Sequence, residues 1–196
     1  ADIDRALAYV DAREQERLQE QHQQLLHRLF ICSVIDPDLQ VSGNRVTRLA
    51  SNDGQFRRAL GGYEFPRDAP TLFVVRIHSL ANWVVCGIIN NTTGSSNSYS
   101  DPTTFGWASS NQVYKAGART NGDGGWGTWQ AADVAIFKYD PMTRQLSMFH
   151  RRLNRLFTID SLPDIPFRLH LNLRYHPTEV EVTPATPQDL TGTGFA

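Results

Sequence analysis

The sequence predicts an all-β fold, an antiparallel β-sandwich preceded by one N-terminal α-helix. Residues 2–29 contain no Gly or Pro and are rich in Ala, Leu, Glu, Gln and Arg, which favour a helix. From residue 30 onward, short runs rich in Val, Ile, Phe and Thr alternate with clusters of Gly, Pro, Asn and Asp. No helical periodicity separates these runs, which argues against the parallel sheet of an α/β protein.

The helical segment, residues 1–29, is expected to need a partner. Apolar side chains recur at the spacing of a coiled-coil seam at Ile3, Ala6, Val10, Leu18, Leu25 and Leu29. Glu14 and Arg17 interrupt this seam. Because an isolated helix this polar is marginally stable in water, we predict one of two arrangements. Residues 2–29 form a homodimeric coiled coil, or the helix packs on the domain that follows it.

Ten strands are predicted within a sandwich domain of residues 30–183. They span residues 30–35, 46–49, 71–78, 83–89, 98–107, 133–139, 145–150, 157–159, 168–174 and 179–182. The clearest hairpin covers residues 134–149, where Asp140 and Pro141 supply the turn between two alternating strands. Residues 184–196 show no periodicity, and we expect them to form a loose tail.

Composition narrows the classes of partner and compartment. The chain has 19 basic and 20 acidic residues and a net charge of -1, so nothing in it demands nucleic acid or an anionic membrane. No apolar run of about 18 residues is present, so no membrane span is predicted. Cys32 and Cys86 lie inside apolar runs and are expected to be free core thiols. They predict a reducing compartment, which we take to be the cytoplasm.

No motif for catalysis or for binding a metal or cofactor is found. The six histidines are scattered, without the spacing of a zinc site. The 121–126 loop, Asn-Gly-Asp-Gly-Gly-Trp, begins like a calcium loop but lacks the carboxylates that should follow. Asn90 and Asn91 each begin an Asn-x-Thr sequon, which has meaning only in a secreted protein. The sequence does not exclude a pair of catalytic carboxylates that are distant in the chain and close in the fold, so a sandwich-fold glycoside hydrolase is a third, weaker hypothesis.

Four segments resemble a known family when they are taken in order. They are Val-Ile-Asp-Pro-Asp at 34–38, Asn-Trp-Val-Val-Cys-Gly-Ile at 82–88, Phe-Gly-Trp at 105–107 before Tyr-Lys-Ala-Gly at 114–117, and Asp-Val-Ala-Ile-Phe at 133–137 with Leu-Ser-Met-Phe at 146–149. Together they resemble the SPRY (PRY-SPRY) domain, which tripartite-motif proteins place behind a coiled coil. The chain departs from the pattern at 69–78, which lacks a Tyr-Trp pair, and at Ala132, where the family has Gly.

The resemblance implies a SPRY-type, jelly-roll-like sandwich that recognises a protein or peptide ligand and is not an enzyme. It also suggests the substrate-targeting arm of a larger ubiquitin ligase, whose RING and B-box regions would lie upstream. The alternative is a carbohydrate-binding, lectin-like β-sandwich. That alternative is favoured by the Trp, Tyr and Asn content and by the Asn-Gly-Asp loop.

The predicted binding face combines loop composition with the resemblance. Residues 97–114 mix aromatics with Ser and Asn, a composition typical of adaptable binding loops. In the family, the central strand and the hairpin tip at 150–155 contribute contacts. The predicted ligand-binding residues are therefore Tyr99, Phe105, Trp107, Ser109, Tyr114, Arg151 and Arg152. Trp107 could equally pack between the sheets, and the two arginines could equally lie in a solvated turn. Trp83 is assigned to the core.

Overall fold

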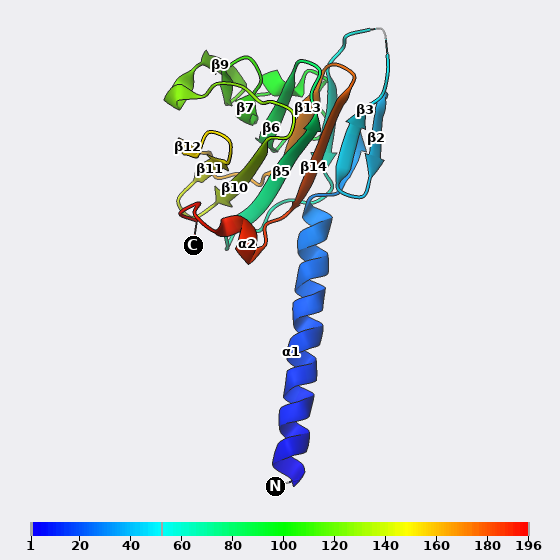
Figure 1. The fold of residues 1–196 in the computed structure, drawn as a ribbon, viewed down its shortest axis with the longest axis vertical. Coiled ribbons are helices and arrows are strands. Elements are labelled where there is room, and N and C mark those ends of the chain that lie inside the picture. The colour runs from blue at the N-terminus through cyan, green and yellow to red at the C-terminus, as the bar shows by residue number, and fades with distance from the viewer. Residues whose placement is uncertain (1, 52, 196) are drawn as a thin grey trace.

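The computed structural model describes residues 2–51 and 53–195, with the side chains of the N-terminal helix described from residue 12 onward. The described residues form two seven-stranded sheets in which every pairing is antiparallel. The predicted antiparallel sandwich behind an N-terminal helix is confirmed (Figure 1).

The spatial order of the strands differs from their order in the chain. Across the first sheet it runs through β1 (Cys32–Ile35), β4 (Arg57–Gly61), β13 (Arg168–Leu173), β6 (Val84–Ile89), β7 (Phe105–Ala108), β8 (Gln112–Lys115) and β9 (Ala118–Asn121). Across the second sheet it runs through β12 (Arg155–Ile159), β11 (Gln145–His150), β10 (Val134–Asp140), β5 (Thr71–Ser79), β14 (Thr178–Pro184), β3 (Arg45–Arg48) and β2 (Leu39–Ser42). Strands β2, β4, β8 and β9 are additions to the ten that were predicted.

The hydrophobic core fills the space between the two sheets. Phe73 of β5 and Phe137 of β10 stack with ring centroids 4.9 Å apart, and both are fully buried. From the first sheet, alternate residues such as Leu169 and Leu171 of β13 face the same core. This alternation is expected for a sheet with one face on the core. The intervening residues of the first sheet therefore point outward, and they become important for the candidate site.

The hairpin of β10 and β11 follows its prediction closely. Asp140 pairs with Gln145 at the end of the ladder, and the Asp140 carboxylate accepts hydrogen bonds from the backbone N–H groups of Met142 and Thr143 at 3.0 and 3.2 Å. The predicted strand at 98–107 is different. A 3₁₀ turn, η1 (Ser98–Ser100), and the Asp101 turn precede β7, because the Asp101 side chain accepts from the Thr103 N–H and hydroxyl.

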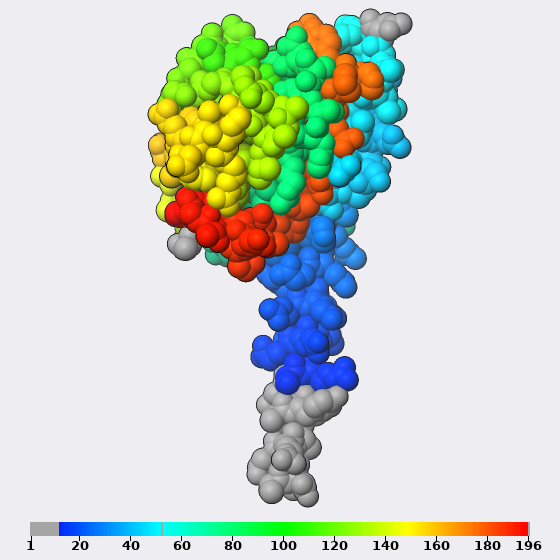
Figure 2. Space-filling model, viewed as in Figure 1, coloured from blue at the N-terminus to red at the C-terminus, as the bar shows by residue number. Residues whose placement is uncertain are grey.

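Helix α1 (Asp2–Leu29) stands away from the sandwich, as Figures 1 and 2 show. Among its described side chains, those of the last turns contact the domain, where Leu26 and Leu29 pack against the core next to Phe30. The helix therefore does not fold back along the sandwich. Of the predicted seam, Leu18 and Leu25 are 48% and 60% exposed. Ile3, Ala6 and Val10 lie outside the part of the chain whose side chains are described.

Residues 184–195 include a short helix and pack on the sandwich, which corrects the expectation of a loose tail over this described part. A short helix, α2 (Pro187–Leu190), begins with a capping box between Thr186 and Asp189. Further on, Phe195 is 8% exposed and packs on the outer face of the second sheet against Val74, Ile136 and Phe149. The apolar outer face of that sheet accounts for the order, since covering it removes hydrophobic surface from water.

Candidate functional site

The seven predicted binding residues do not form one surface. Phe105 and Trp107 point into the core, where Trp107 is 1% exposed and its ring lies 5.7 Å from that of Phe137. The alternative of a core tryptophan is the one that the structure shows. Ser109 is equally buried, and its hydroxyl accepts a hydrogen bond from the Val84 N–H at 3.2 Å. These three side chains are placed to hold the sandwich together.

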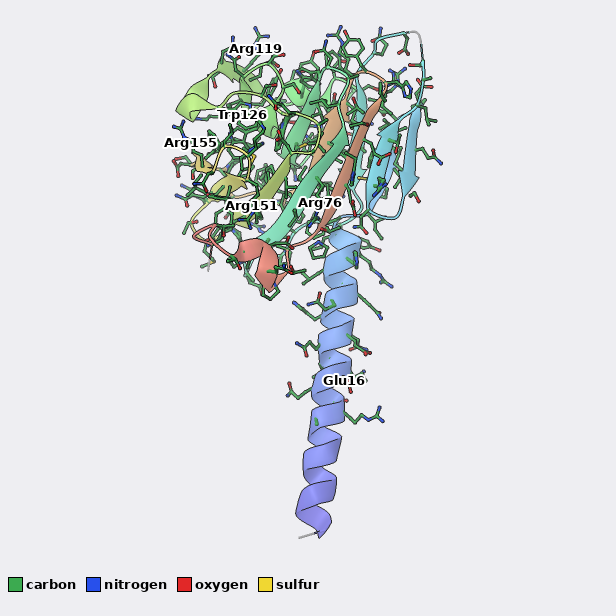
Figure 3. All side chains as sticks on the ribbon, viewed as in Figure 1. Glu16, Arg76, Arg119, Trp126, Arg151 and Arg155 are labelled. Atoms are coloured by element: carbon green, nitrogen blue, oxygen red, sulfur yellow. The ribbon has the colours of Figure 1, made fainter. Side chains whose placement is uncertain are left out.

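Arg151 and Arg152 lie in the turn between β11 and β12 of the second sheet and make internal contacts. Arg151 donates to the backbone carbonyls of Asp189 and Thr191 at 2.5 and 2.9 Å, which ties down the tail. Arg152 donates to both carboxylate oxygens of buried Asp133 at 2.6 and 3.1 Å. Figure 3 shows Arg151 near the tail, at a distance from β9. The hairpin tip therefore does not join the loop of Tyr99 in a common face.

Tyr99 and Tyr114 do come together, on the outer face of the first sheet. They meet two residues that were not predicted for the site, Phe56 and Trp83. Tyr99 occupies the centre, with ring centroids 4.6 Å from Phe56, 5.4 Å from Trp83 and 5.6 Å from Tyr114. We call these four side chains the aromatic patch. The assignment of Trp83 to the core is corrected in part, since it is buried on this outer face and not between the sheets.

The strands explain why these side chains gather at one end of the sheet. Phe56 immediately precedes β4, and Trp83 immediately precedes β6. Strand β13 lies between β4 and β6, and its last residue, Leu173, pairs with Arg57 on one side and Val84 on the other. Because β4 and β6 are both antiparallel to β13, their first residues lie at the same end of the sheet. The amide oxygen of Gln112 accepts from the Trp83 indole at 3.0 Å and from the Tyr114 hydroxyl at 3.1 Å.

A buried polar cluster holds the loop that delivers Tyr99. The Ser98 hydroxyl lies 2.7 Å from Nε2 of His170 and accepts from the Asn172 amide at 2.8 Å. His170 and Asn172 are fully buried on the outer side of β13, under the 90–104 loop. Burial lowers the pKa of His170 to about 3, so its ring is neutral at physiological pH. Because Ser98 adjoins Tyr99, this cluster fixes the centre of the aromatic patch.

Exposure divides the patch into a floor and an accessible layer. Trp83 and Tyr114 are 6% and 4% exposed, whereas Phe56 and Tyr99 are half-buried. Burial raises the pKa of Tyr114 above its usual value, so this hydroxyl stays protonated. The patch therefore offers aromatic surface together with tyrosine hydroxyl groups, which suits non-covalent contacts.

Other features of the described residues bear on metals, thiols and membranes. The side chains described in the structure, those of residues 12–51 and 53–195, bring together no three His, Cys, Asp or Glu that could hold a metal ion. Cys32 and Cys86 are buried free thiols, and burial raises the pKa of Cys32 to about 12. Across that same described part, no helix combines the length and apolar character needed to cross a membrane.

Comparison with known proteins identifies the type of fold. The sequence matches no protein-family model and no curated protein sequence. The SPRY domain of human HERC1 is similar in structure, with a TM-score of 0.60 and 10% identity over 78% of this chain and 98% of that one. The TRIM65 PSpry domain gives a TM-score of 0.59 and 13% identity over 77% and 91% of the two chains.

A third similar structure is stonustoxin, with a TM-score of 0.52 and 10% identity. The match covers 76% of this chain but 26% of stonustoxin. At identities this low, the likeness establishes the fold alone. The chain is an antiparallel β-sandwich of the SPRY type with a helix at its N-terminus.

Proposed function

We propose that this protein is a non-catalytic recognition module that binds a protein or peptide ligand on the aromatic patch. The observation that supports this most is the position of Tyr99, a half-buried aromatic side chain on a fixed loop. The adjacent Ser98 holds this loop in place through three hydrogen bonds. Tyr and Trp on a rigid support give large contact area at low entropic cost. Loops fixed by a sandwich are also where binding residues concentrate.

The test is binding by the whole chain of peptides selected from a random phage-displayed library. Tyr99→Ala should weaken a selected peptide by more than about 1 kcal/mol, the scale of an interface anchor. Tyr63→Ala is the matched control, because Tyr63 is 55% exposed and lies at the base of α1, outside the patch. Peptides that bind both variants equally well would move the site elsewhere on the domain.

The carbohydrate-binding alternative is tested with the same variants on a glycan array. Aromatic rings also stack on sugars, so the patch alone does not discriminate between the two ligand classes. Selective glycan binding that Tyr99→Ala removes, without any selected peptide, would favour the lectin-like function. If no glycan on the array binds and a selected peptide binds in a Tyr99-dependent way, the result would support recognition of a protein or peptide.

We further propose that the module is the targeting arm of a ubiquitin ligase that acts in the cytoplasm. The support is the resemblance to tripartite-motif proteins together with two buried, reduced cysteines. The test is co-expression of the complete natural protein with a captured partner in cells. The partner should gain ubiquitin conjugates, and Tyr99→Ala should abolish them. Conjugation that is insensitive to Tyr99 would argue against a targeting role for this domain.

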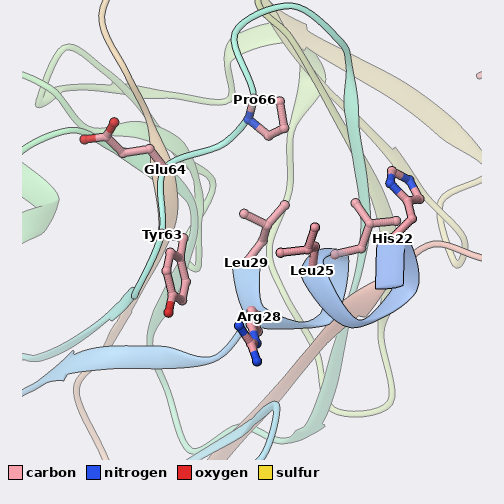
Figure 4. A pocket seen from close by; sticks show the side chains of 8 residues that line it. His22, Leu25, Arg28, Leu29, Tyr63, Glu64 and Pro66 are labelled. Atoms are coloured by element: carbon pink, nitrogen blue, oxygen red, sulfur yellow. The ribbon is translucent and has the colours of Figure 1, made fainter. Parts of the chain in front are cut away.

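Finally, we propose that α1 forms a homodimeric coiled coil. Exposed Leu18 and Leu25 share one helix face, seven residues apart. At the C-terminal end of the helix this face meets a 320 Å³ pocket, whose lining includes Leu25, Leu29, Tyr63 and Pro66 (Figure 4). Light scattering should give twice the monomer mass for the whole chain and a monomer for the double variant Leu18→Gln, Leu25→Gln. A monomeric wild type would remove this proposal.

A further inference from the structure

The aromatic patch is bordered by two arginines that have no carboxylate partner among the described residues. The guanidinium of Arg174 lies 4.7 Å from the ring centroid of Phe56 and 4.8 Å from that of Tyr175. Its Nε donates to the Gly54 carbonyl at 3.0 Å, which fixes the side chain in place. Arg119 is exposed on β9 directly opposite Tyr114, at the end of the sandwich remote from α1 (Figure 3).

Several other charged side chains around the patch are paired with one another. Arg57 binds the carboxylates of Asp38 and Asp53, and the same two carboxylates bind Arg48. On the other side, Lys115 pairs with Asp123 at 2.5 Å.

One carboxylate near the patch, that of Asp101 in the turn after Tyr99, has no cationic partner within the described part of the chain. It accepts hydrogen bonds from the Thr103 N–H and hydroxyl and from the Asn91 amide, at 2.6 to 2.8 Å. Its oxygens are therefore occupied within the turn. Two unpaired arginines therefore stand against this one carboxylate, which leaves the patch with a local excess of positive charge, although the whole chain carries a net charge of -1.

The two arginines lie at opposite ends of a row of aromatic rings. From Arg119 the row passes through Tyr114, Tyr99 and Phe56 to Arg174, and the ring centroids are separated by 5.6 and 4.6 Å. The cross-strand step from Arg119 to Tyr114 is about 5 Å. Because an extended strand rises about 3.3 Å per residue, a peptide of at most about six residues spans the row.

We propose that the ligand of the aromatic patch is a short acidic peptide segment, with an apolar side chain on Phe56 and Tyr99 and carboxylates at Arg174 and Arg119. This inference rests on the proposed recognition function and adds the chemical class of the partner. A guanidinium binds a carboxylate through two parallel N–H···O bonds, a geometry that lysine does not offer. Arg174 is already immobilised by Gly54 and the rings, so little side-chain entropy is lost on binding.

The experiment uses peptides selected on the whole chain from a random library at low salt, labelled with fluorescein. They should be enriched in Asp and Glu within six positions of an apolar residue. Arg174→Gln and Arg119→Gln should each weaken binding roughly tenfold, the loss expected for a charge-assisted hydrogen bond. Arg144→Gln is the control, because it changes the net charge equally at the exposed β10–β11 turn. Thermal unfolding confirms that each variant is folded.

A double-mutant cycle separates charge pairing from general electrostatics. Replacing by an amide only the peptide carboxylate that pairs with Arg174 should weaken wild-type binding roughly tenfold and have little effect on the Arg174→Gln variant. Raising the salt from 50 to 500 mM should also weaken binding, since exposed charges are screened.

Two outcomes would overturn the inference in different ways. If binding of the selected peptides depends on Tyr99 but on neither arginine, the proposal of an acidic ligand is wrong and the proposed recognition function is still supported. Peptides that bind independently of Tyr99, or an arginine-dependent response only to sialylated or sulfated glycans on an array, would remove the peptide proposal itself.

Discussion

Acidification should destabilise this protein through His170, whose imidazole is fully buried beneath the 90–104 loop. Burial lowers its pKa from 6.5 to about 3. As the pH falls below 6.5, the unfolded chain takes up a proton at this position and the folded chain does not. The free energy of unfolding therefore decreases over the window from pH 6.5 down to pH 3.

The magnitude follows from that difference in pKa. Each pH unit inside the window costs about 1.4 kcal/mol. Integration from pH 7 to pH 5 gives a loss of about 2 kcal/mol for this one group. Such a loss is a large share of the 5–15 kcal/mol that is typical of a folded domain.

The assay is urea unfolding of the wild type and of His170→Gln at pH 7, 6 and 5, at constant ionic strength. Glutamine does not titrate, while the other groups titrate in both proteins and cancel in the difference. One of these is His150, whose pKa is also lowered by burial. The stability of the wild type relative to the variant should fall by about 2 kcal/mol between pH 7 and pH 5. Parallel pH profiles would refute the neutral, buried state of His170.

Three other substitutions test the structure. Trp107→Ala should cost about 3–5 kcal/mol in urea unfolding, because a core ring that is 1% exposed is removed; a loss below 1 kcal/mol would contradict its burial. Ala132→Gly should raise stability by about 0.5 kcal/mol, since Ala132 has a left-handed φ of 68°; a lower melting temperature would oppose this. Arg151→Ala should speed hydrogen exchange in the α2 segment, and unchanged exchange there would show that Arg151 does not hold the tail.

The β10–β11 hairpin could be predicted because each of its strands has one face on the core and a turn with clear chemistry. The first sheet gave a weaker signal. All six residues of β6 and all four of β7 are buried, since the 90–104 loop and the aromatic patch cover their outer side. Burial on both faces removes the alternation that assigns side chains to a face. For this reason Trp107 could not be separated from an outward-facing residue by its sequence neighbourhood.

The aromatic patch depends on contacts between distant parts of the chain. Phe56, Trp83, Tyr99 and Tyr114 come from four separate segments, and only the order of strands β4, β13, β6, β7 and β8 brings them together. Composition identified the 97–114 segment, which supplied Tyr99 from a loop and Tyr114 from β8. Phe56 stands among polar residues just before a strand that was not predicted, so no local signal marked it. The Thr186–Asp189 capping box was a local signal for the ordered tail.

Strand β13 shows how one segment serves stability and recognition together. Its inward residues, including Leu171, are fully buried in the core. Its outward residues His170 and Asn172 hold the Tyr99 loop, and Arg174, just beyond the strand, covers Phe56. Protonation of His170 would first disturb the hydrogen bonds that hold the Tyr99 loop, since these lie on the face of β13 opposite to the core. Acid should therefore weaken ligand binding at a higher pH than the one at which the sandwich unfolds, because the anchor involves fewer buried contacts than the core.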